Sequence, residues 1–398
     1  MTKNNIKDLA IFGNQPTFDK SFCVGQFNMP KWEKFEDVFN GIFSRRYYTN
    51  QGPLTEELES KLCEFLRVKN AVCVTNATLG LLMIVKALGL KGKVIIPSFS
   101  FISNAQSLLW AGVEPIFCDV DSNSYNISIS TVEPNINGNV SAILGFHTWG
   151  NSCHSKDLQQ LATQKGIKLY YDATHAFGSI HDGINFGNFG DLEVFSFNAT
   201  EILSATEGGC VCTNDDLLAE KLRNIRSSYG TRKTVSVPLT ANGRMSEAQA
   251  AMALLSLEDF EKNRQRNKIF YEMYINELND IEGIKFFIPE ESNRNNYQNI
   301  VFEISEKKFG ISRDKLLQIL ASENIICQKV FYPGLHRTPP FSDMYHEYIN
   351  ALPTTDRLCD EVLQLPSGYN IDDNFIETIC ELIRLIHKHA DIFSKDLG

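Results

Sequence analysis

Between about residues 54 and 215, apolar strand-like runs alternate with helical patterns. This alternation is typical of a mostly parallel sheet that is covered by helices on both faces. The predicted strands are Ala71–Thr75, Val94–Ile96, Pro115–Asp119, Ala142–Phe146, Lys168–Asp172 and Val194–Phe197. The predicted helices between them are Leu79–Leu88, Ile102–Ala111 and Ser155–Gly166, where apolar residues recur at helical spacing. The pattern therefore predicts an α/β fold for this part of the chain.

The remainder of the chain has a different pattern. A helical pattern runs from Ser246 to about Leu278, and we interpret it as the connection to a second domain. Beyond about Ile281, short strands such as Asn299–Phe302 alternate with helices, and these helices are predicted at Ser312–Glu323 and Asp373–His387. Because 398 residues exceed what one hydrophobic core normally serves, we predict a large domain over residues 1–260 and a smaller C-terminal α+β domain over residues 261–398.

The charge balance argues against several classes of protein. Lys and Arg number 38 against 48 Asp and Glu, so the net charge of −10 disfavours a general binder of nucleic acid or of membrane surfaces. The ten cysteines are scattered without a Cys-x-x-Cys pair, and we expect neither a disulfide framework nor a metal site. No apolar signal core and no 18-residue apolar run is visible, which predicts a cytoplasmic location.

Polar residues follow two of the predicted strands, where open parallel sheets bind their ligands. The turn Asn76–Gly80 leads directly into a helix, and its backbone N–H groups would suit a phosphate. Asn76 or Thr78 acting as an ordinary helix cap is the alternative. Asp172 ends another strand, and its carboxylate can pair with a protonated pyridine nitrogen. Alternatively, Asp172 caps the following turn and His175, three residues on, packs in the core.

The run Val194–Gly209 contains two further candidates, Ser196 and the turn Glu207-Gly208-Gly209. Ser196 lies five residues before Glu201, and its hydroxyl could reach the same phosphate as the Asn76–Gly80 turn. The following turn, which ends Gly208-Gly209, permits a tight reversal of the chain, although it could be a structural loop only.

This run resembles the cofactor-attachment segment of the DegT/DnrJ/EryC1/StrS family, the sugar aminotransferases of fold-type I that use pyridoxal 5'-phosphate. The likeness covers nearly the whole chain, and it includes the segments Tyr48–Pro53, Pro97–Phe101, Asn242–Glu247, Tyr332–His336 and Leu352–Leu358. The order and spacing of these motifs are more specific than any one of them. The resemblance implies a mostly parallel central sheet in the large domain and a smaller C-terminal α+β domain.

The resemblance also implies roles for individual residues. Asp172 would bind the pyridine nitrogen, and His175 and Phe101 would lie on opposite faces of the ring. The phosphate would be held by Ala77, Thr78 and Ser196, and by Asn242 from the neighbouring subunit of a homodimer, and Asn198 would also bind the cofactor. Tyr332 and His336 would border the sugar or nucleotide.

The implied reaction moves an amino group from glutamate to a keto group of a nucleotide-linked deoxy sugar, and we favour a dTDP-linked 4-keto-6-deoxy hexose aminated at C4. The products of such enzymes enter O-antigen and lipopolysaccharide. The family's Schiff-base lysine is replaced here by Glu201, which cannot condense with an aldehyde. We favour an engineered replacement that leaves the chain inactive and traps the external aldimine of an amino sugar nucleotide. A keto-sugar dehydratase that uses pyridoxamine phosphate and a non-catalytic nucleotide-sugar binder are the alternatives.

Overall fold

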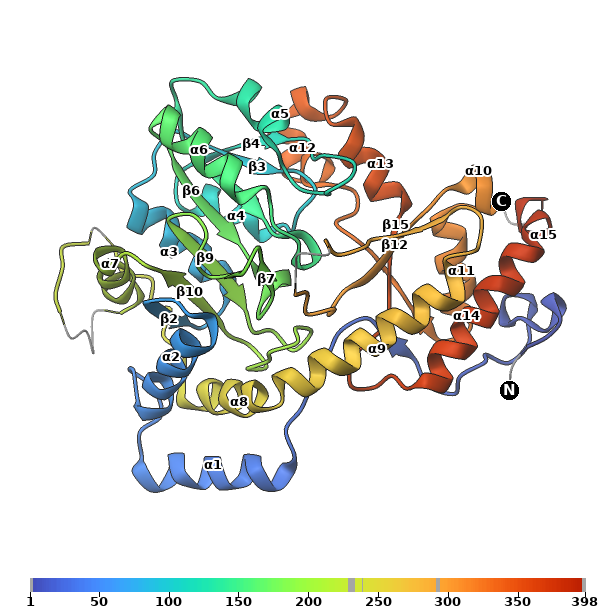
Figure 1. Ribbon diagram of the computed structural model, residues 1–398, viewed down its shortest axis with the longest axis horizontal. Coiled ribbons are helices and arrows are strands. Elements are labelled where there is room, and N and C mark those ends of the chain that lie inside the picture. Colours follow the sequence, from blue (N-terminus) through green and yellow to red (C-terminus); the bar gives the residue numbers. More distant parts are fainter. Residues whose placement is uncertain (1–2, 228–232, 238, 291–293, 396–398) are drawn as a thin grey trace.

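The computed structural model describes residues 3–227, 233–237, 239–290 and 294–395. Its centre is a seven-stranded sheet in the order β2-β10-β9-β6-β5-β3-β4 (Figure 1). These strands are β2 Asn70–Val74, β3 Lys93–Pro97, β4 Glu114–Cys118, β5 Val140–Phe146, β6 Lys168–Asp172, β9 Leu192–Ser196 and β10 Gly209–Thr213. All pairings are parallel except those of β10, which runs antiparallel to both of its neighbours. The predicted α/β class and mostly parallel sheet are confirmed, and β10 is the strand that the sequence analysis missed.

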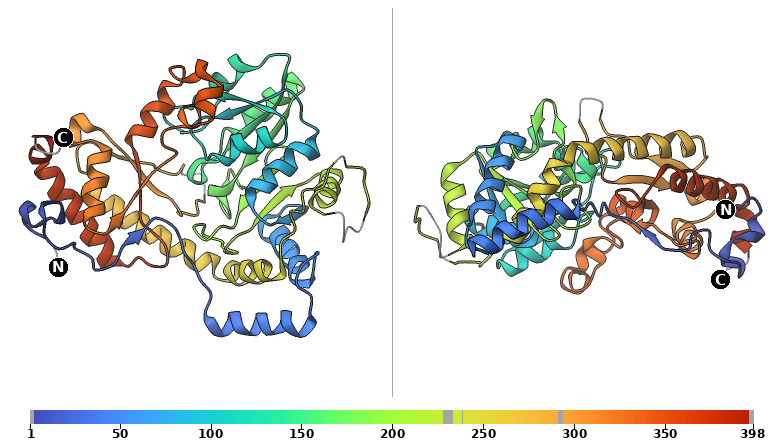
Figure 2. Two further views of the ribbon diagram at one scale, coloured as in Figure 1. Left: turned by 180° about the vertical axis from the view of Figure 1, so that it is seen from behind. Right: turned by 90° about the horizontal axis from the view of Figure 1, so that it is seen from below.

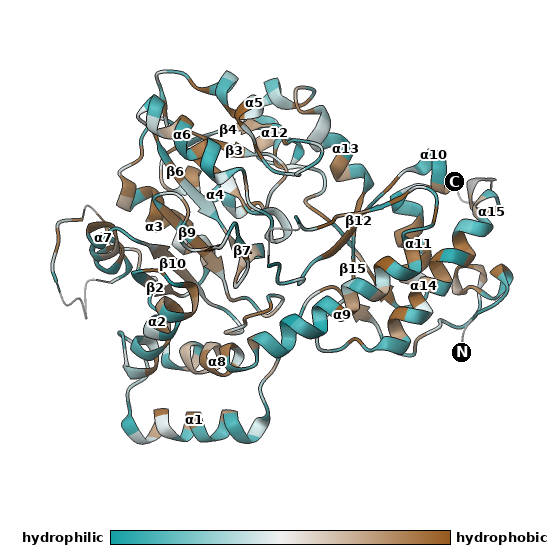
Figure 3. Ribbon diagram, viewed as in Figure 1, coloured by the Kyte–Doolittle hydropathy of each residue, from teal (hydrophilic) through white to brown (hydrophobic). Residues whose placement is uncertain are grey.

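Helices cover both faces of this sheet. The helices of the large sheet are α2 Pro53–Leu66, α3 Ala77–Leu88, α4 Ser103–Trp110, α5 Ile129–Val132, α6 Ser155–Lys165 and α7 Asp216–Arg226. Side chains of successive strand residues point to opposite faces of the sheet. In β2, Cys73 belongs to the apolar cluster with α2 and α6 on one face, whereas Val72 and Val74 belong to the cluster with α3, α4 and α7 on the other. Figure 3 shows the resulting distribution, with apolar residues concentrated in the strands.

A second, four-stranded antiparallel sheet has the order β11-β12-β15-β14. Its strands are β11 Ile284–Phe286, β12 Ile300–Ile304, β14 Gln328–Lys329 and β15 Val362–Leu365. The helices α9 Phe260–Leu278, α11 Arg313–Ser322 and α14 Asp373–Lys388 enclose a separate core with this sheet. The long helix predicted from Ser246 is two helices, because α8 Glu247–Glu258 ends at Asp259 and α9 begins there.

The N-terminal segment packs against the C-terminal part of the chain. Ile6 and Leu9 belong to the core of the smaller sheet, and β1 Phe22–Cys23 pairs in parallel with β13 Ile325–Ile326. The two ends of the chain accordingly lie on the same side of the molecule in Figures 1 and 2. The predicted domain boundary at residue 260 stays a prediction. Ile6 and Leu9, which that boundary assigns to the large domain, pack in the core of the smaller sheet.

The other α-helices and β-strands are α1 Trp32–Arg45, α10 Glu306–Phe309, α12 Phe341–Met344, α13 Pro353–Glu361, α15 Ala390–Lys395, β7 Ile180–His181 and β8 Ile184–Asn185. Helix α1 packs along α8 at the edge of the molecule (Figure 1). Across the ranges given above, no helix is both long enough and apolar enough to cross a bilayer.

Candidate active site

Asp172 ends β6 with a carboxyl group that is almost completely buried. Its Oδ1 accepts hydrogen bonds from the backbone N–H of Thr174 at 3.0 Å and from the Thr174 hydroxyl at 2.6 Å. Burial raises the pKa of this carboxyl, and the two bonds from Thr174 limit the rise. Asn104, from the start of α4, lies beside Asp172 and also limits the rise of its pKa, although no hydrogen bond of normal geometry to the buried Asn104 amide occurs among the described residues. Asp172 therefore caps the turn, as the alternative interpretation had it, and has a second polar side chain beside it.

His175 follows in a short 3₁₀ turn and is held by aromatic neighbours. Its ring stacks on Phe331 with centroids 5.9 Å apart, and its Nδ1 accepts a hydrogen bond from the backbone N–H of Trp149 at 3.4 Å. Burial lowers the pKa of His175 to about 3, so the imidazole is neutral at physiological pH. A neutral ring held flat in this way suits contact with another aromatic ring.

The N-terminus of α3 offers two free backbone donors. Asn76 caps the helix by accepting from Leu79 N at 2.9 Å, while the N–H groups of Ala77 and Thr78 make no hydrogen bond within the described residues. Gly209 lies between Val74 and Ser196 in the sheet register, and a Cβ at Gly209 would lie 2.9 Å from Ala77 N. The missing side chain of Gly209 lets β10 pass close to the helix terminus. Open N–H groups at a positive helix end fit a phosphate.

Asn198 shapes the loop that leaves β9. Its backbone N–H donates to Ser196 Oγ at 3.3 Å, and its Oδ1 accepts from the backbone N–H of Thr200 at 3.1 Å. Its Nδ2 donates to Glu207 Oε1 at 2.6 Å across the loop. These bonds set the path of the chain from Ser196 to Glu201.

The side chain of Glu201 is hydrogen-bonded to Gln298, a residue from the C-terminal part of the chain. Its Oε2 accepts a hydrogen bond from Gln298 Nε2 at 2.6 Å, and Gln298 Oε1 accepts from Ile202 N at 3.1 Å. Burial, together with the nearby negative charge of Asp172, raises the pKa of Glu201 to about 8. The two carboxyl groups therefore interact electrostatically, and Glu201 carries a proton at neutral pH.

The other predicted site residues have different surroundings. Phe101 is 57% exposed and Tyr332 is 49% exposed. The Tyr332 ring lies under Lys329 Nζ, at 4.6 Å from the ring centroid. His336, in contrast, is fully buried, with Nδ1 2.7 Å from Ser98 Oγ and Nε2 3.0 Å from Asp356 Oδ1. Both of its ring nitrogens already have protein partners, so its contact with a sugar stays a prediction.

Asn242 is exposed and has a positive φ of 49°. Its Oδ1 accepts a hydrogen bond from Arg244 Nη2, and the next residue, Gly243, accepts from Thr75 N at 2.9 Å. Asn242 therefore lies on a segment attached to the end of β2 in its own subunit. Its contact with a partner's phosphate stays a prediction.

Comparison with known proteins identifies the family. The model of the DegT/DnrJ/EryC1/StrS aminotransferase family matches residues 32–384. The chain belongs to this aminotransferase family. A relative from Shigella dysenteriae, a dTDP-4-amino-4,6-dideoxy-D-glucose transaminase, is 34% identical, with 92% of this chain and 100% of the relative covered. One of the same name from Escherichia coli is 31% identical, with 92% and 98% covered. The structure of DesI with its TDP-sugar product superposes with a TM-score of 0.93 at 35% identity, covering 98% of both chains.

Most of the site fits pyridoxal phosphate, the cofactor of this aminotransferase family. The free N–H groups of Ala77 and Thr78 suit its phosphate, and the carboxyl of Asp172 suits its ring nitrogen. The neutral imidazole of His175 suits a ring face. The loop between Asn198 and Gly209 contains no lysine, so the amine for covalent attachment is the part that does not fit.

Several residues of this aminotransferase site were missed from the sequence. They are Asn104, Trp149, Gln298 and Phe331. Asn104 lies three residues beyond Phe101, in the predicted helix Ile102–Ala111, and Phe331 directly precedes Tyr332. For Asn104 and Phe331, closeness in the sequence to a predicted site residue was a usable signal. Gln298 lies 97 residues from Glu201 and had no such signal.

Proposed function

We propose that this chain is a nucleotide-sugar aminotransferase in which Glu201 stands at the position of the amine-bearing lysine and leaves the chain inactive in amino transfer. The observation that carries this proposal is the placement of Glu201 itself. It lies in the loop that follows Ser196, where the charge of Asp172 acts on it, and Gln298 holds its carboxyl group. A carboxyl group cannot condense with an aldehyde, so Glu201 would not attach pyridoxal phosphate to the chain and would supply no amine to displace an amino sugar nucleotide held on the cofactor.

The proposed substrate is a dTDP-linked 4-keto-6-deoxy hexose, aminated at C4, with glutamate as the amino donor. Support comes from the names of the relatives at 34% and 31% identity and of DesI at 35%. A relative named for amination at C3 is less similar, at 26%. GDP-perosamine synthases, also among the relatives, support a place in O-antigen or lipopolysaccharide synthesis in the cytoplasm.

We assign the binding work to the chain's own residues. Asp172 holds the ring nitrogen, His175 and Phe101 lie on the two ring faces, and Ala77 with Ser196 holds the phosphate. When bound, pyridoxal phosphate supplies an electron sink for the carbon that bears the amino group. Glu201 carries a proton near neutral pH because burial raises its pKa to about 8. It can therefore donate a proton in this site but cannot attach the cofactor.

We propose further that the protein works as a homodimer with shared sites. Large apolar side chains are exposed on and just after α1, where Trp32 is 67% and Phe43 is 65% exposed. Exposed aromatic clusters of this kind mark protein interfaces. A second subunit would cover this region and place its Asn242 near the phosphate.

The Glu201→Lys variant tests the proposed function. We expect it to gain amino-sugar formation from glutamate and a keto-sugar nucleotide, and to retain cofactor on the chain after borohydride reduction. The protein as given should show neither property. Reduced cofactor on a lysine of the unchanged protein, found by peptide mapping, would refute the assignment of Glu201. Thr206→Lys, which places a lysine at an exposed position of the same loop, is the matched control and should restore nothing.

One observation favours a second function. Glu201 is protonated in this site and hence is a proton carrier already in place. A keto-sugar dehydratase that uses pyridoxamine phosphate needs such a group but no covalent attachment. Formation of a deoxygenated sugar by the unchanged protein would establish this alternative. Turnover by neither the protein nor Glu201→Lys would instead identify a non-catalytic nucleotide-sugar binder.

A further inference from the structure

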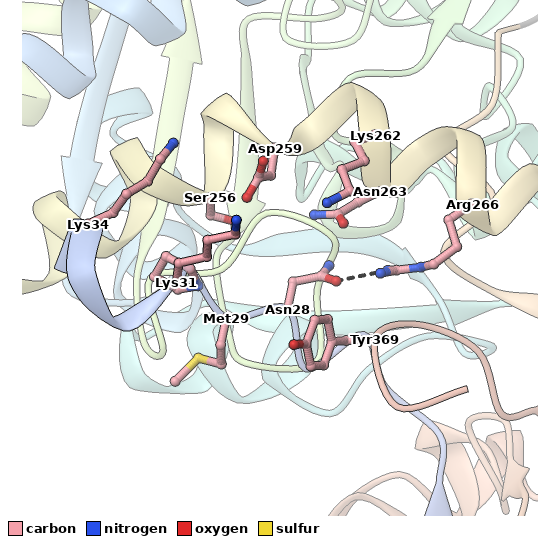
Figure 4. Close-up of a pocket in the computed structure, with 11 residues that line it drawn as sticks. Asn28, Met29, Lys31, Lys34, Ser256, Asp259, Lys262, Asn263, Arg266 and Tyr369 are labelled. Atoms are coloured by element: carbon pink, nitrogen blue, oxygen red, sulfur yellow. Dashed lines mark hydrogen bonds between the residues drawn. The ribbon is translucent and has the colours of Figure 1, made fainter. Parts of the chain in front are cut away.

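A cavity of about 360 Å³ lies between the N-terminal segment, the junction of α8 with α9, and the loop after β15. Small-molecule sites typically have volumes of ~300–1,000 Å³. Four cationic side chains line it, namely Lys31, Lys34, Lys262 and Arg266. Asp259 is the only carboxylate among the described residues that line it (Figure 4). The cavity is therefore basic, although the chain as a whole has a net charge of −10.

Arg266 is the most informative of these cations. Its Nη2 donates to Asn28 Oδ1 at 2.8 Å (Figure 4), whereas its buried Nε has no hydrogen-bond partner among the residues that the structure describes. No ion pair to Arg266 occurs in the described part of the chain, and burial lowers its pKa. A partly buried guanidinium without a counter-charge is costly unless an anion neutralises it. Guanidinium groups bind phosphate oxygens particularly well.

The neighbouring side chains suit the same kind of ligand. Lys31 and Lys262 are exposed, and neither forms an ion pair within the residues that the structure covers, whereas Lys34 pairs with Glu258 at 2.7 Å. Tyr369 is 60% exposed on the opposite wall and offers a ring face. Aromatic faces of this kind stack on nucleic-acid bases. The cavity thus combines cations for phosphates with a surface for a base.

The cavity wall is also attached to the loop that carries Glu201. Asn28 Nδ2 donates to the backbone oxygen of Ile202 at 3.1 Å, and the backbone N–H of Ser204 donates to Ser256 Oγ at 3.0 Å. Asn28 and Ser256 both line the cavity. A ligand in the cavity would therefore contact Asn28 and Ser256, which are hydrogen-bonded to the loop that carries Glu201.

We propose that this cavity binds the diphosphate group of a nucleotide, with Arg266, Lys262 and Lys31 on the phosphate oxygens and Tyr369 against the base. The diphosphate is that of a nucleoside diphosphate bound in addition to the nucleotide sugar of the active site, and this inference does not depend on the proposed function.

Calorimetric titration with inorganic pyrophosphate and with dTDP tests the proposal. Charge-assisted hydrogen bonds contribute about 1.5–3 kcal/mol each, so Arg266→Gln and Lys262→Gln should each raise the dissociation constant about tenfold or more. Lys262 is exposed on α9, and its replacement leaves the fold intact even if that of Arg266 does not. Lys268→Gln is the matched control, because Lys268 is on the same helix and pairs with Glu272 instead. Unchanged affinity in both cavity variants, or no binding of either probe by the unchanged protein, would overturn the proposal.

A competition experiment tests whether the cavity is separate from the substrate site. If dTDP and a dTDP-linked amino sugar bind together and Lys262→Gln weakens only dTDP, the cavity is a separate nucleotide site. If dTDP displaces the dTDP-linked amino sugar and Lys262→Gln weakens both, the diphosphate is that of the substrate and the proposal fails. Pyrophosphate binding requires no turnover, so failure of Glu201→Lys to transaminate would leave this result standing.

Discussion

At the residue scale, the carboxyl of Glu201 is held in a setting that favours its neutral form. Its surroundings are buried, Asp172 adds negative charge, and Gln298 supplies one compensating hydrogen bond. In an unfolded chain the same carboxyl would ionise near pH 4.5. In the folded protein, Glu201 therefore either keeps its proton or lowers the free energy of unfolding through a buried negative charge.

This difference predicts a pH-dependent loss of stability. Between pH 4.5 and about 8, the folded protein holds a proton at Glu201 that the unfolded chain has lost, so the free energy of unfolding falls as pH rises through this interval. Glu201→Gln is neutral at every pH and should escape this loss. Each pKa unit corresponds to about 1.4 kcal/mol, so the variant should gain on the order of 4 kcal/mol relative to the parent between pH 5 and pH 8.5. Urea unfolding at several pH values measures the difference, and parallel curves for the two proteins would contradict a raised pKa.

The sequence allowed the prediction of those site residues that follow strands or belong to recognisable motifs. Asp172 and Ser196 lie at strand ends in the structure, as predicted. Gln298 was not predictable, because a glutamine in a loop 97 residues from Glu201 has no local pattern that marks it. The burial of His336 was also invisible, since its partner Asp356 lies 20 residues further on, in α13. Contacts between distant segments depend on tertiary packing, which neither spacing nor composition reports.

At the element scale, the approach of β10 to α3 creates the proposed phosphate site. β10 is inserted antiparallel between β2 and β9, so that Gly209 lies in register with Val74 and Ser196. This places the start of β10 against the backbone of Ala77. A side chain at position 209 would displace either the neighbouring strand or the helix, because the atoms that it would contact are backbone atoms.

We therefore predict that Gly209→Ala damages both stability and cofactor binding. The new Cβ would lie 2.8 Å from the Phe195 oxygen and 2.9 Å from Ala77 N, so backbone must move. Overpacking of this kind costs about 1–3 kcal/mol. Absorbance titration with pyridoxal phosphate should show weaker binding, since the N–H groups of Ala77 and Thr78 are displaced. Gly138→Ala is the control, because nothing lies within 4 Å of its Cβ position, and equal effects of the two changes would refute the argument.

The elements themselves were largely predictable, and the misses have physical causes. The six predicted strands form buried apolar runs between helices, and all are present. β10 was missed because it follows its neighbour β9 after an irregular loop instead of a helix, which breaks the alternating pattern. The break between α8 and α9 at Asp259 was missed because helical spacing continues through it.

At the scale of the whole molecule, two cores are joined by α8 and α9, and α1 remains at the edge (Figure 1). Exposed aromatic residues on and near α1 suggest that a second subunit completes the surface. Asn242 provides a way to test the proposed sharing of sites, because its side chain is exposed in the single chain.

We expect the protein to sediment as a homodimer, and Asn242→Gly to weaken cofactor retention without unfolding it. Glycine tolerates the positive φ of 49° at this position, so the change removes only the side chain. A hydrogen bond to a charged phosphate contributes about 1.5–3 kcal/mol, which corresponds to about tenfold weaker retention or more. Asn137→Ala, exposed just before β5 and separated from β2 by three strands in the sheet order, is the control. A monomer that binds the cofactor tightly would contradict the shared site.

The last prediction concerns the ligand that the whole protein stores. In the proposed function, a lysine amine would displace the amino sugar from its adduct with the cofactor, and Glu201 leaves only slow attack by water. Intramolecular attack can reach effective molarities of about 10⁵ M or more, so its loss should make the adduct long-lived. A ligand that binds only the folded state at a hundred times its dissociation constant stabilises it by about 2.7 kcal/mol. Pyridoxal phosphate together with a dTDP-linked amino sugar should therefore raise the melting temperature more than the sum of the two alone, and this excess should shrink in Glu201→Lys. If a simple amino acid with the cofactor stabilises the protein equally well, the site is that of a general aminotransferase and the sugar assignment fails.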